Sequence, residues 1–170
     1  FVLPYFTFGA QQIVHAKFEP ESLVDAFEHR GANATALVPT MVARLLAMPD
    51  ISLERMANLE ILGYAGAPMP PEQIRQCFER ITPRMSQYYG LVEAIPPVTV
   101  LGPADHRCGI EGDTEILTSA GLPCNGVEIR IVDELGQDVP TGEVGEVITR
   151  GDHVMRGYYG QAGQDPTVTK

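Results

Sequence analysis

Residues 21–39 read ESLVDAFEHRGANATALVP, and this stretch indicates the fold of the first half of the chain. Residues 21–30 predict a helix, because their apolar side chains form one face and Gly31 follows as a stop signal. Residues 34–38 predict a strand, because they form a short apolar run that ends at Pro39. Uninterrupted apolar strands are typical of a parallel sheet buried on both faces.

The same alternation of strands and helices continues on both sides of this stretch. Strands covered by helices through short links are typical of an α/β fold, so residues 1–97 are expected to form a flavodoxin-like subdomain: a parallel sheet with flanking helices. The further expected strands are 12–18, 59–64 and 84–88, and the further helices are 41–48 and one that begins at Pro70 or Pro71.

The pattern changes after Pro96-Pro97, where helical periodicity is no longer evident and glycines become frequent. Residues 98–170 are therefore expected to form a small antiparallel β-subdomain, in which residues 102–115 are a polar connecting loop. Its expected strands are 127–132, 144–149 and 154–158, with a turn at 133–137.

Composition and charge exclude several classes of protein. The net charge is −10, which argues against binding a nucleic-acid backbone. No apolar run approaches the roughly 20 residues of a membrane-spanning helix. The three cysteines form no CxxC pair, which favours a reducing, cytoplasmic location. The sequence leaves a homo-oligomer open.

The first eight residues are apolar, but they are too few and lack the basic flank of a signal peptide. The chain has no initiator Met and begins inside this apolar run. We therefore expect residues 1–8 to be a core element entered partway, and the chain to be an internal piece of a longer protein.

The segment Gly66-Ala67-Pro68 follows the predicted strand 59–64. Ligands of open parallel sheets bind outside the carboxyl ends of the strands, and a glycine without Cβ allows a close approach there. Taken alone, the segment also fits an ordinary turn before a helix.

The next predicted strand ends in Tyr88-Tyr89-Gly90-Leu91-Val92-Glu93. A tyrosine ring can stack on a purine, Gly90 can turn the chain, and the Glu93 carboxylate can bind magnesium, a hard cation that takes oxygen ligands. The plainer interpretation is two core tyrosines and an exposed glutamate. Because both segments follow neighbouring strands, we expect them to face one crevice.

Several segments together resemble the adenylate-forming enzymes: acyl-CoA synthetases, luciferases of the firefly type and peptide-synthetase adenylation domains. The AMP-forming fatty-acid–CoA ligases are the nearest match, and the resemblance covers nearly the whole chain. The segments that carry it, in order, are Val38-Pro39-Thr40, Gly63 to Pro68, Tyr88 to Glu93, Gly121-Leu122-Pro123 with Ile131-Val132-Asp133, and Gly142 to Gly151 with Gly157-Tyr158.

The resemblance implies that the fold is that of the family's large N-terminal domain and that the adenine ring of ATP lies between two segments. The nucleotide-binding residues would be Gly66, Ala67, Pro68, Tyr88, Tyr89, Gly90 and Val92, and Glu93 would bind magnesium. The family usually has Thr where this chain has Val92, and losing that hydrogen bond would cost about tenfold to a hundredfold in affinity.

The resemblance also implies an activity. The full enzyme would activate a carboxylic acid, expected to be a fatty acid, with ATP and transfer it to coenzyme A. The family's phosphate loop, its ribose-binding Asp and its adenylation Lys match nothing in the chain, so the isolated chain is expected to be inactive and to contain no complete catalytic set. Two alternatives remain open: a peptide-synthetase adenylation domain and a non-catalytic nucleotide-binding paralogue.

Overall fold

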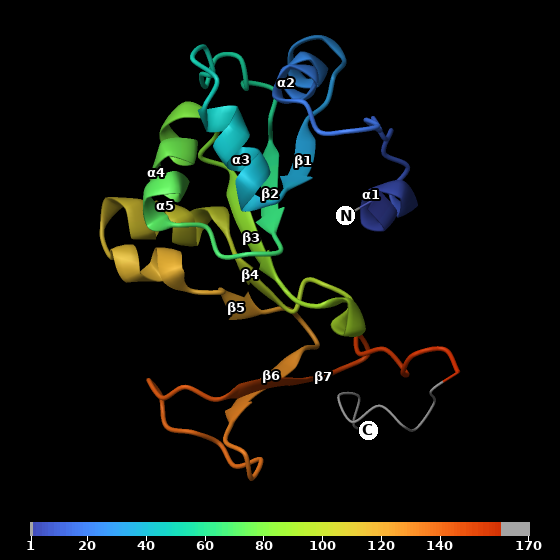
Figure 1. The fold of residues 1–170 in the computed structure, drawn as a ribbon, viewed down its shortest axis with the longest axis vertical. Helices are drawn as coiled ribbons and strands as arrows, with labels where there is room; N and C mark the ends of the chain where they lie inside the picture. Colours follow the sequence, from blue (N-terminus) through green and yellow to red (C-terminus); the bar gives the residue numbers. More distant parts are fainter. Residues whose placement is uncertain (1, 161–170) are drawn as a thin grey trace. The chain divides into compact units, whose positions relative to one another are not determined.

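Two sheets organise residues 2–160, the part of the chain that the computed structural model describes (Figure 1). β1 and β2 run parallel, with Thr35 opposite Leu62, and β5 runs antiparallel to β4, so the larger sheet is mixed. The expected α/β class, with a separate small antiparallel sheet, is confirmed. The larger sheet has the order β1 (Ala34–Leu37), β2 (Ile61–Ala65), β3 (Met85–Tyr89), β4 (Thr99–Leu101) and β5 (Leu122–Pro123), and the smaller sheet pairs β6 (Glu128–Val132) with β7 (Glu146–Arg150).

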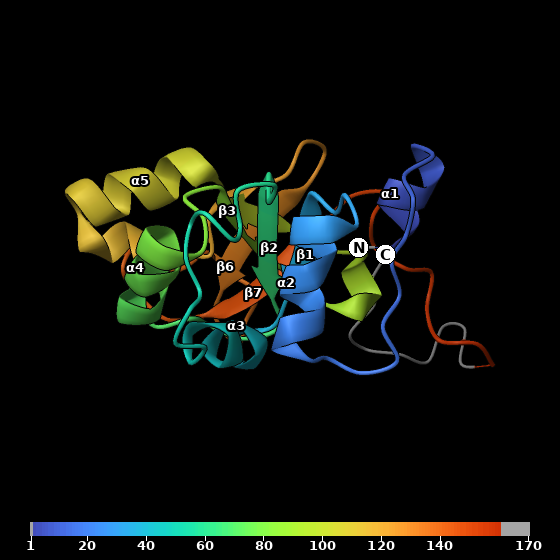
Figure 2. The ribbon, with the colours of Figure 1, turned by 90° about the horizontal axis from the view of Figure 1, so that it is seen from above.

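The helices that pack around the first strands begin with proline. Proline suits the first helical turn, because the amide hydrogen that it lacks would have no partner within the helix there. α4 contacts α3 on one side and α5 on the other, where Arg75 donates to the carbonyl of Ile110 at 3.2 Å (Figure 2). The helices are α2 (Pro20–His29), α3 (Pro39–Leu46), α4 (Pro71–Arg80) and α5 (Pro103–Glu111), and a short α1 (Val2–Thr7) precedes them.

The hydrophobic core lies between the helices α2 to α4 and the strands β1 to β3. Each fully buried aliphatic or aromatic side chain stabilises the fold by about 1.5–3 kcal/mol. The apolar face predicted for the helix at residues 21–30 is the face that the structure buries, through Val24, Ala26 and Phe27. Core residues from each of these elements include Val24, Phe27, Leu37, Val42, Leu45, Leu62, Ile74 and Met85.

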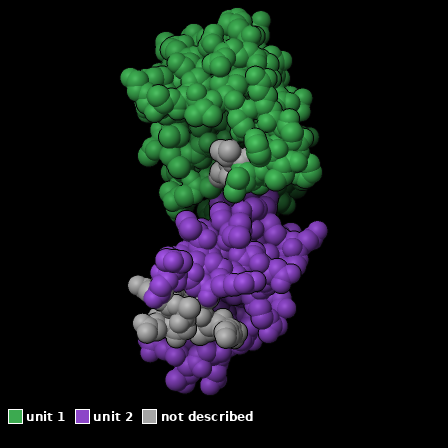
Figure 3. Space-filling view, turned by 90° about the vertical axis from the view of Figure 1, so that its right-hand side faces the viewer, with its two compact units in different colours: residues 1–87, 101–119 green, residues 88–100, 120–170 purple. Residues whose placement is uncertain are grey.

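The chain divides into two compact units, which Figure 3 distinguishes by colour. The first unit consists of residues 1–87 and 101–119, and the second of residues 88–100 and 120–170. Helix α5 therefore belongs to the first unit, although it follows Pro97 in the sequence. The subdomain boundary after residue 97 stays a prediction of the sequence pattern.

The expected loop at 102–115 is wrong, because this segment contains α5 and the 3-10 helix η2 (Thr114–Thr118). Pro103 begins α5, and the Asp105 carboxylate accepts from the Gly102 amide at 2.9 Å, as in a capping box. The helix buries His106 and Gly109, which give no apolar periodicity in the sequence.

The expected strands at 12–18 and 154–158 are also wrong, because the structure has no regular element at either place. Residues 1–8 were expected in a core, yet Leu3 and Phe6 of α1 and the following Phe8 are exposed. The expected turn at 133–137 is confirmed: Asp133 Oδ1 accepts from the amides of Leu135 and Gln137, both at 2.9 Å.

Within residues 2–160, no helix has the length and apolar character required to cross a membrane.

Candidate functional site

The first candidate segment is the turn that follows β2. Gly66 has φ +88°, in the left-handed region that favours glycine. A Cβ at Gly66 would lie 3.5 Å from Cγ1 of Val38, an ordinary contact, so the backbone angle rather than the available space requires glycine. Ala67 and Pro68 are exposed and the next side chain, Met69, is buried. The turn thus presents a short exposed stretch of backbone between buried residues.

The second candidate segment begins with the two tyrosines that end β3. Tyr88 is half-buried, and Tyr89 keeps 38% of its surface exposed. The carbonyl of Tyr89 accepts from the amide of Val98 at 2.8 Å, which holds the backbone behind the ring. A partly exposed ring on a fixed backbone can stack on an aromatic ligand.

Gly90 is required for a reason that differs from the predicted one. The sequence suggested a residue that turns the chain, but its φ is not in the left-handed region. A Cβ at this position would lie 2.8 Å from Cβ of Pro96 and 3.3 Å from the amide nitrogen of Val98. Glycine is therefore required because the following loop packs against it.

Val92 and Glu93 lie in a one-turn 3-10 helix, η1 (Val92–Ala94). Val92 is 83% exposed, so its methyl groups support no core and this position can contact a ligand or solvent. Glu93 is half-buried, and two residues from a distant part of the chain hold it. The amide of Met155 donates to the Glu93 carbonyl at 2.8 Å, and the Tyr158 hydroxyl donates to its carboxylate.

Sequence reasoning missed this contact with Tyr158. In the sequence, Tyr158 stands out only as part of the Gly157-Tyr158 motif, and 65 positions separate it from Glu93. No local signal pointed to this contact, because it joins two residues that only the fold brings together. The structure gives this tyrosine a polar role beside the predicted magnesium ligand.

One carboxylate, that of Glu93, is the predicted protein ligand of a magnesium ion that would be shared with a phosphate. Magnesium commonly takes only one or two carboxylates from the protein and completes its shell with water and phosphate oxygens. Glu93 supplies one such carboxylate, already oriented by a hydroxyl. Residues 2–160 contain no group of three or more acidic, histidine or cysteine side chains that could hold a metal ion by themselves.

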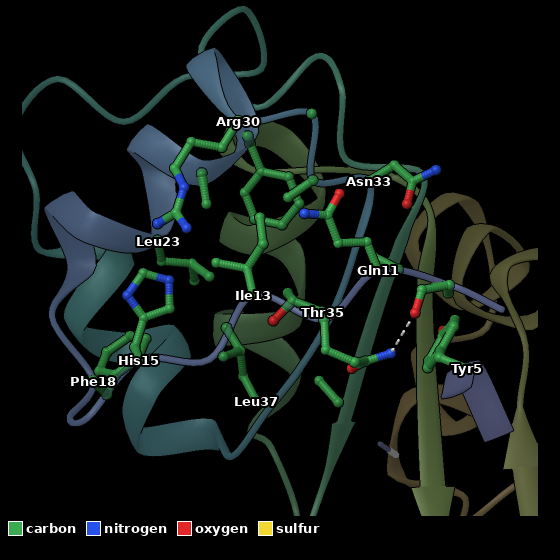
Figure 4. Close-up of a pocket in the computed structure, with 18 of the residues that line it drawn as sticks. Tyr5, Gln11, Ile13, His15, Phe18, Leu23, Arg30, Asn33, Thr35 and Leu37 are labelled. Atoms are coloured by element: carbon green, nitrogen blue, oxygen red, sulfur yellow. Dashed lines mark hydrogen bonds between the residues drawn. The ribbon is translucent and has the colours of Figure 1, made fainter. Parts of the chain in front are cut away.

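A separate pocket of about 660 Å³ lies between residues 10–19, helix α2 and strand β1 (Figure 4). Ile13, His15 and Phe18 line it together with Leu23 of α2 and Thr35 of β1. The segment predicted as the first strand therefore lines a pocket. None of the pocket's lining residues belongs to either candidate segment.

The two candidate segments thus have defined local structures, one in each compact unit. Gly66, Ala67 and Pro68 form a turn in the first unit, and Tyr88 to Glu93 form a strand end and a 3-10 turn in the second. Their joint role around a nucleotide stays a prediction.

Comparison with protein families and curated proteins gives a consistent result. The family model described as "AMP-binding enzyme" matches residues 1–159. The medium/long-chain-fatty-acid–CoA ligase FadD8 of Mycobacterium tuberculosis is 34% identical over 159 residues, which are 94% of this chain and 27% of that protein. A feruloyl-CoA synthase of an Amycolatopsis species is 32% identical over 94% of this chain and 31% of its own length.

Solved structures agree with these relatives. The amide bond synthetase McbA from Marinactinospora thermotolerans has a TM-score of 0.76 and 32% identity, over 86% of this chain and 28% of that one. O-succinylbenzoate coenzyme A synthetase (MenE) from Bacillus subtilis, in complex with ATP and magnesium ion, has a TM-score of 0.78 and 25% identity, over 94% of this chain and 31% of its own. The chain thus spans about a third or less of each of these proteins. It belongs to the family of AMP-binding enzymes.

Proposed function

We propose that this chain is the part of an ATP-dependent acyl-CoA ligase that holds the adenine ring and contributes one magnesium ligand. The whole enzyme would activate a carboxylic acid, most readily a fatty acid, as acyl-AMP and transfer the acyl group to coenzyme A. The observation that carries this proposal is the family match over residues 1–159, and it is supported by the partial exposure of Tyr89 and by the hydrogen bond from Tyr158 to Glu93.

The two segments contribute different contacts in this proposal. The partly exposed ring of Tyr89 would stack on one face of adenine, a contact worth about 0.5–1.5 kcal/mol beyond area burial. The exposed turn Gly66-Ala67-Pro68 would contact the other face, and its left-handed glycine keeps the backbone free of a side chain there. Tyr88 would support Tyr89, and Gly90 would set the path of the chain toward Val92 and Glu93.

The reaction would proceed in two balanced steps. A carboxylate oxygen of the acid attacks the α-phosphorus of ATP, and the bond to pyrophosphate breaks. The thiol of coenzyme A then attacks the acyl carbon, loses its proton and displaces AMP. Magnesium, when bound, would neutralise charge on the phosphate oxygens. The contribution of this chain is to orient the nucleotide and to hold the Glu93 carboxylate through Tyr158.

The acid is proposed from the relatives. The 34% identity to a medium/long-chain-fatty-acid–CoA ligase favours a fatty acid. Other relatives carry the names feruloyl-CoA synthase, indoleacetate–CoA ligase and 2-succinylbenzoate–CoA ligase, at 29–32% identity. Aromatic acids are therefore the comparison substrates for any test.

The acceptor of the acyl group has a second candidate. The likeness to an amide bond synthetase, at 32% identity and a TM-score of 0.76, favours an amine that would attack the acyl carbon in place of coenzyme A. Both candidates share the first step, so they differ only in the product formed after acyl-AMP.

The test uses the full-length protein that contains residues 1–170. It is incubated with ATP, magnesium and a panel of fatty acids, aromatic acids and amino acids, with coenzyme A or an amine as acceptor. The products are identified by mass spectrometry. We expect AMP and acyl-CoA from fatty acids, and no acyl-AMP from residues 1–170 alone. Release of no AMP with any acid would contradict the proposed activity.

A further inference from the structure

A buried tyrosine–histidine pair joins the end of β2 to helix α5 within the first unit. Tyr64 and His106 are both fully buried, and the Tyr64 hydroxyl lies 2.8 Å from Nε2 of His106. Their rings meet edge to face, with centroids 5.7 Å apart. A hydrogen bond between two buried side chains is costly to leave half-made, because the remaining partner cannot bind water.

The surroundings of His106 decide which group donates. Its Nδ1 lies 2.7 Å from the carbonyl oxygen of Gly102, which can only accept, so Nδ1 carries the hydrogen. Nε2 of the neutral ring is then an acceptor, and the Tyr64 hydroxyl donates to it. Gly102 is in turn held by the Asp105 carboxylate, which accepts from its amide at 2.9 Å. The tyrosine is thus connected to a capped helix start through one fixed tautomer.

This connection lies next to the exposed turn. Tyr64 precedes Gly66 by two residues, and Met69, only 3% exposed, follows Pro68 directly. One buried side chain therefore holds each end of the turn. The hydrogen bond to His106 fixes the position of the Tyr64 hydroxyl and so restricts the ring that carries it.

We propose that His106 is a positioning residue for nucleotide binding, acting through Tyr64 to hold the turn Gly66-Ala67-Pro68 in the conformation that contacts adenine. This inference rests on the proposed function of the turn. His106 itself does not touch the nucleotide. A positioning role differs from a merely structural one in that its loss weakens ATP binding more than an equal loss of stability elsewhere in the core does.

The test compares four variants of the full-length protein with the wild type. Tyr64→Phe removes one oxygen atom, His106→Leu removes the acceptor, and the double variant removes both. Met56→Ala is the matched control, because Met56 is a buried core residue that lies before the start of β2. For each protein, the Kd of a non-hydrolysable ATP analogue is measured by calorimetry, and Tm is measured by scanning calorimetry.

We expect both single variants to raise the Kd of the ATP analogue about fivefold to tenfold, since a lost buried hydrogen bond has an effect of this size. The double variant should be no weaker than either single variant, because it leaves no buried polar group unpaired. Met56→Ala should lower Tm at least as much as either single variant does, while its Kd for the ATP analogue stays within about twofold of that of the wild type. If His106→Leu does not fold, the Kd of Tyr64→Phe alone tests the inference.

Two results would overturn the inference. One is an unchanged Kd in Tyr64→Phe, and the other is an equal rise of Kd in Met56→Ala at the same loss of Tm. Both leave the proposed function intact, since the wild type still binds the analogue. If the wild type binds no ATP analogue, the proposed function fails, and this inference fails with it.

Discussion

The two candidate segments are held in different ways. The turn Gly66–Pro68 lies between side chains that are buried in the core of the first unit. The segment Tyr88–Glu93 is more exposed, and hydrogen bonds from distant residues, among them Met155 and Tyr158, hold its end in the second unit. Core packing sets the geometry of the first segment, whereas polar contacts between loops set that of the second.

This difference predicts how each segment responds to change. A segment held by core packing should lose function together with stability, unless a specific contact such as that of His106 is removed. A segment held by surface hydrogen bonds should lose function while the fold stays intact, because partly exposed contacts contribute little to the free energy of unfolding.

The largest effect is expected from Glu93→Gln in the full-length protein. The amide keeps the size of the side chain but loses the charge that would bind magnesium, so kcat of acyl-AMP formation should fall about 100-fold, with Tm unchanged. Measuring AMP release across a range of magnesium concentrations checks this. Glu143→Gln is the control, since Glu143 is an exposed turn residue that should tolerate the change. Equal activity in both variants would exclude Glu93 as the metal ligand.

Substitutions of Gly90 and Gly66 should destabilise the fold for different reasons. Gly90→Ala places a Cβ against Pro96 and should lower the free energy of unfolding by about 1–3 kcal/mol. Gly66→Ala forces a side chain into the left-handed region, at about 1–2 kcal/mol. Asparagine enters that region more readily than alanine, so Gly66→Asn should be milder than Gly66→Ala, while Gly90→Asn should be no milder than Gly90→Ala. Urea unfolding of the four variants measures these differences, and a reversed order would refute the assignment.

A smaller effect is expected from Tyr158→Phe, which removes the hydroxyl that donates to Glu93. Groups that orient a metal ligand typically contribute about tenfold or more to metal affinity, so half-maximal activity should need about ten times more magnesium. Saturating magnesium should restore most of kcat. Tyr159→Phe, at a fully exposed neighbour, is the control. An unchanged magnesium requirement would show that the hydrogen bond has no part in metal binding.

The smallest effect concerns pH. Burial lowers the pKa of His106 below its usual 6.5, partly offset by the Gly102 carbonyl and the Asp105 carboxylate. The folded state therefore prefers the neutral ring. Its contribution to stability is fully present above about pH 6.5 and falls as the pH drops toward the lowered pKa, by at most about 1.4 kcal/mol per pH unit. Burial raises the pKa values of Tyr64 and Cys77, two buried titratable groups of the same unit, that of Cys77 to about 12, so neither of them titrates in this range.

Urea unfolding between pH 5 and 7.5 checks this dependence. The free energy of unfolding is plotted against pH for the wild type and for the Tyr64→Phe/His106→Leu double variant. The acidic groups contribute equally to both slopes, so the difference between the slopes is the contribution of His106. Identical slopes would show that His106 does not titrate with folding.

Much of the fold could be predicted, because apolar runs and helical periodicity mark the elements that build the core. The strands β1 to β3 and the helices α2 to α4 lie within a few residues of their predicted positions. Helix α5 could not be predicted, since its buried residues are His106 and Gly109, which form no apolar face with helical periodicity in the sequence. Residues 12–18 have β-branched side chains but form no ladder with another described strand, and a strand requires such a partner.

The candidate site also has a part that could be predicted from the sequence and a part that could not. Residue types at strand ends pointed to Tyr89 and Glu93; in the structure, Tyr89 is partly exposed and the carboxylate of Glu93 accepts from Tyr158. The contacts of Tyr158 with Glu93 and of His106 with Tyr64 join residues 65 and 42 positions apart. Only folding brings such pairs together, so no local pattern could indicate them.

The most direct test of the central claim is photolabelling of the full-length protein with 2-azido-ATP, followed by trypsin digestion and mass spectrometry. The two segments fall in different tryptic peptides, residues 56–75 and 85–107. If both segments contact adenine, both peptides should carry the label, Tyr89 should be a modified residue, and excess ATP should abolish the labelling. Label confined to other peptides, or label that ATP does not displace, would contradict the account.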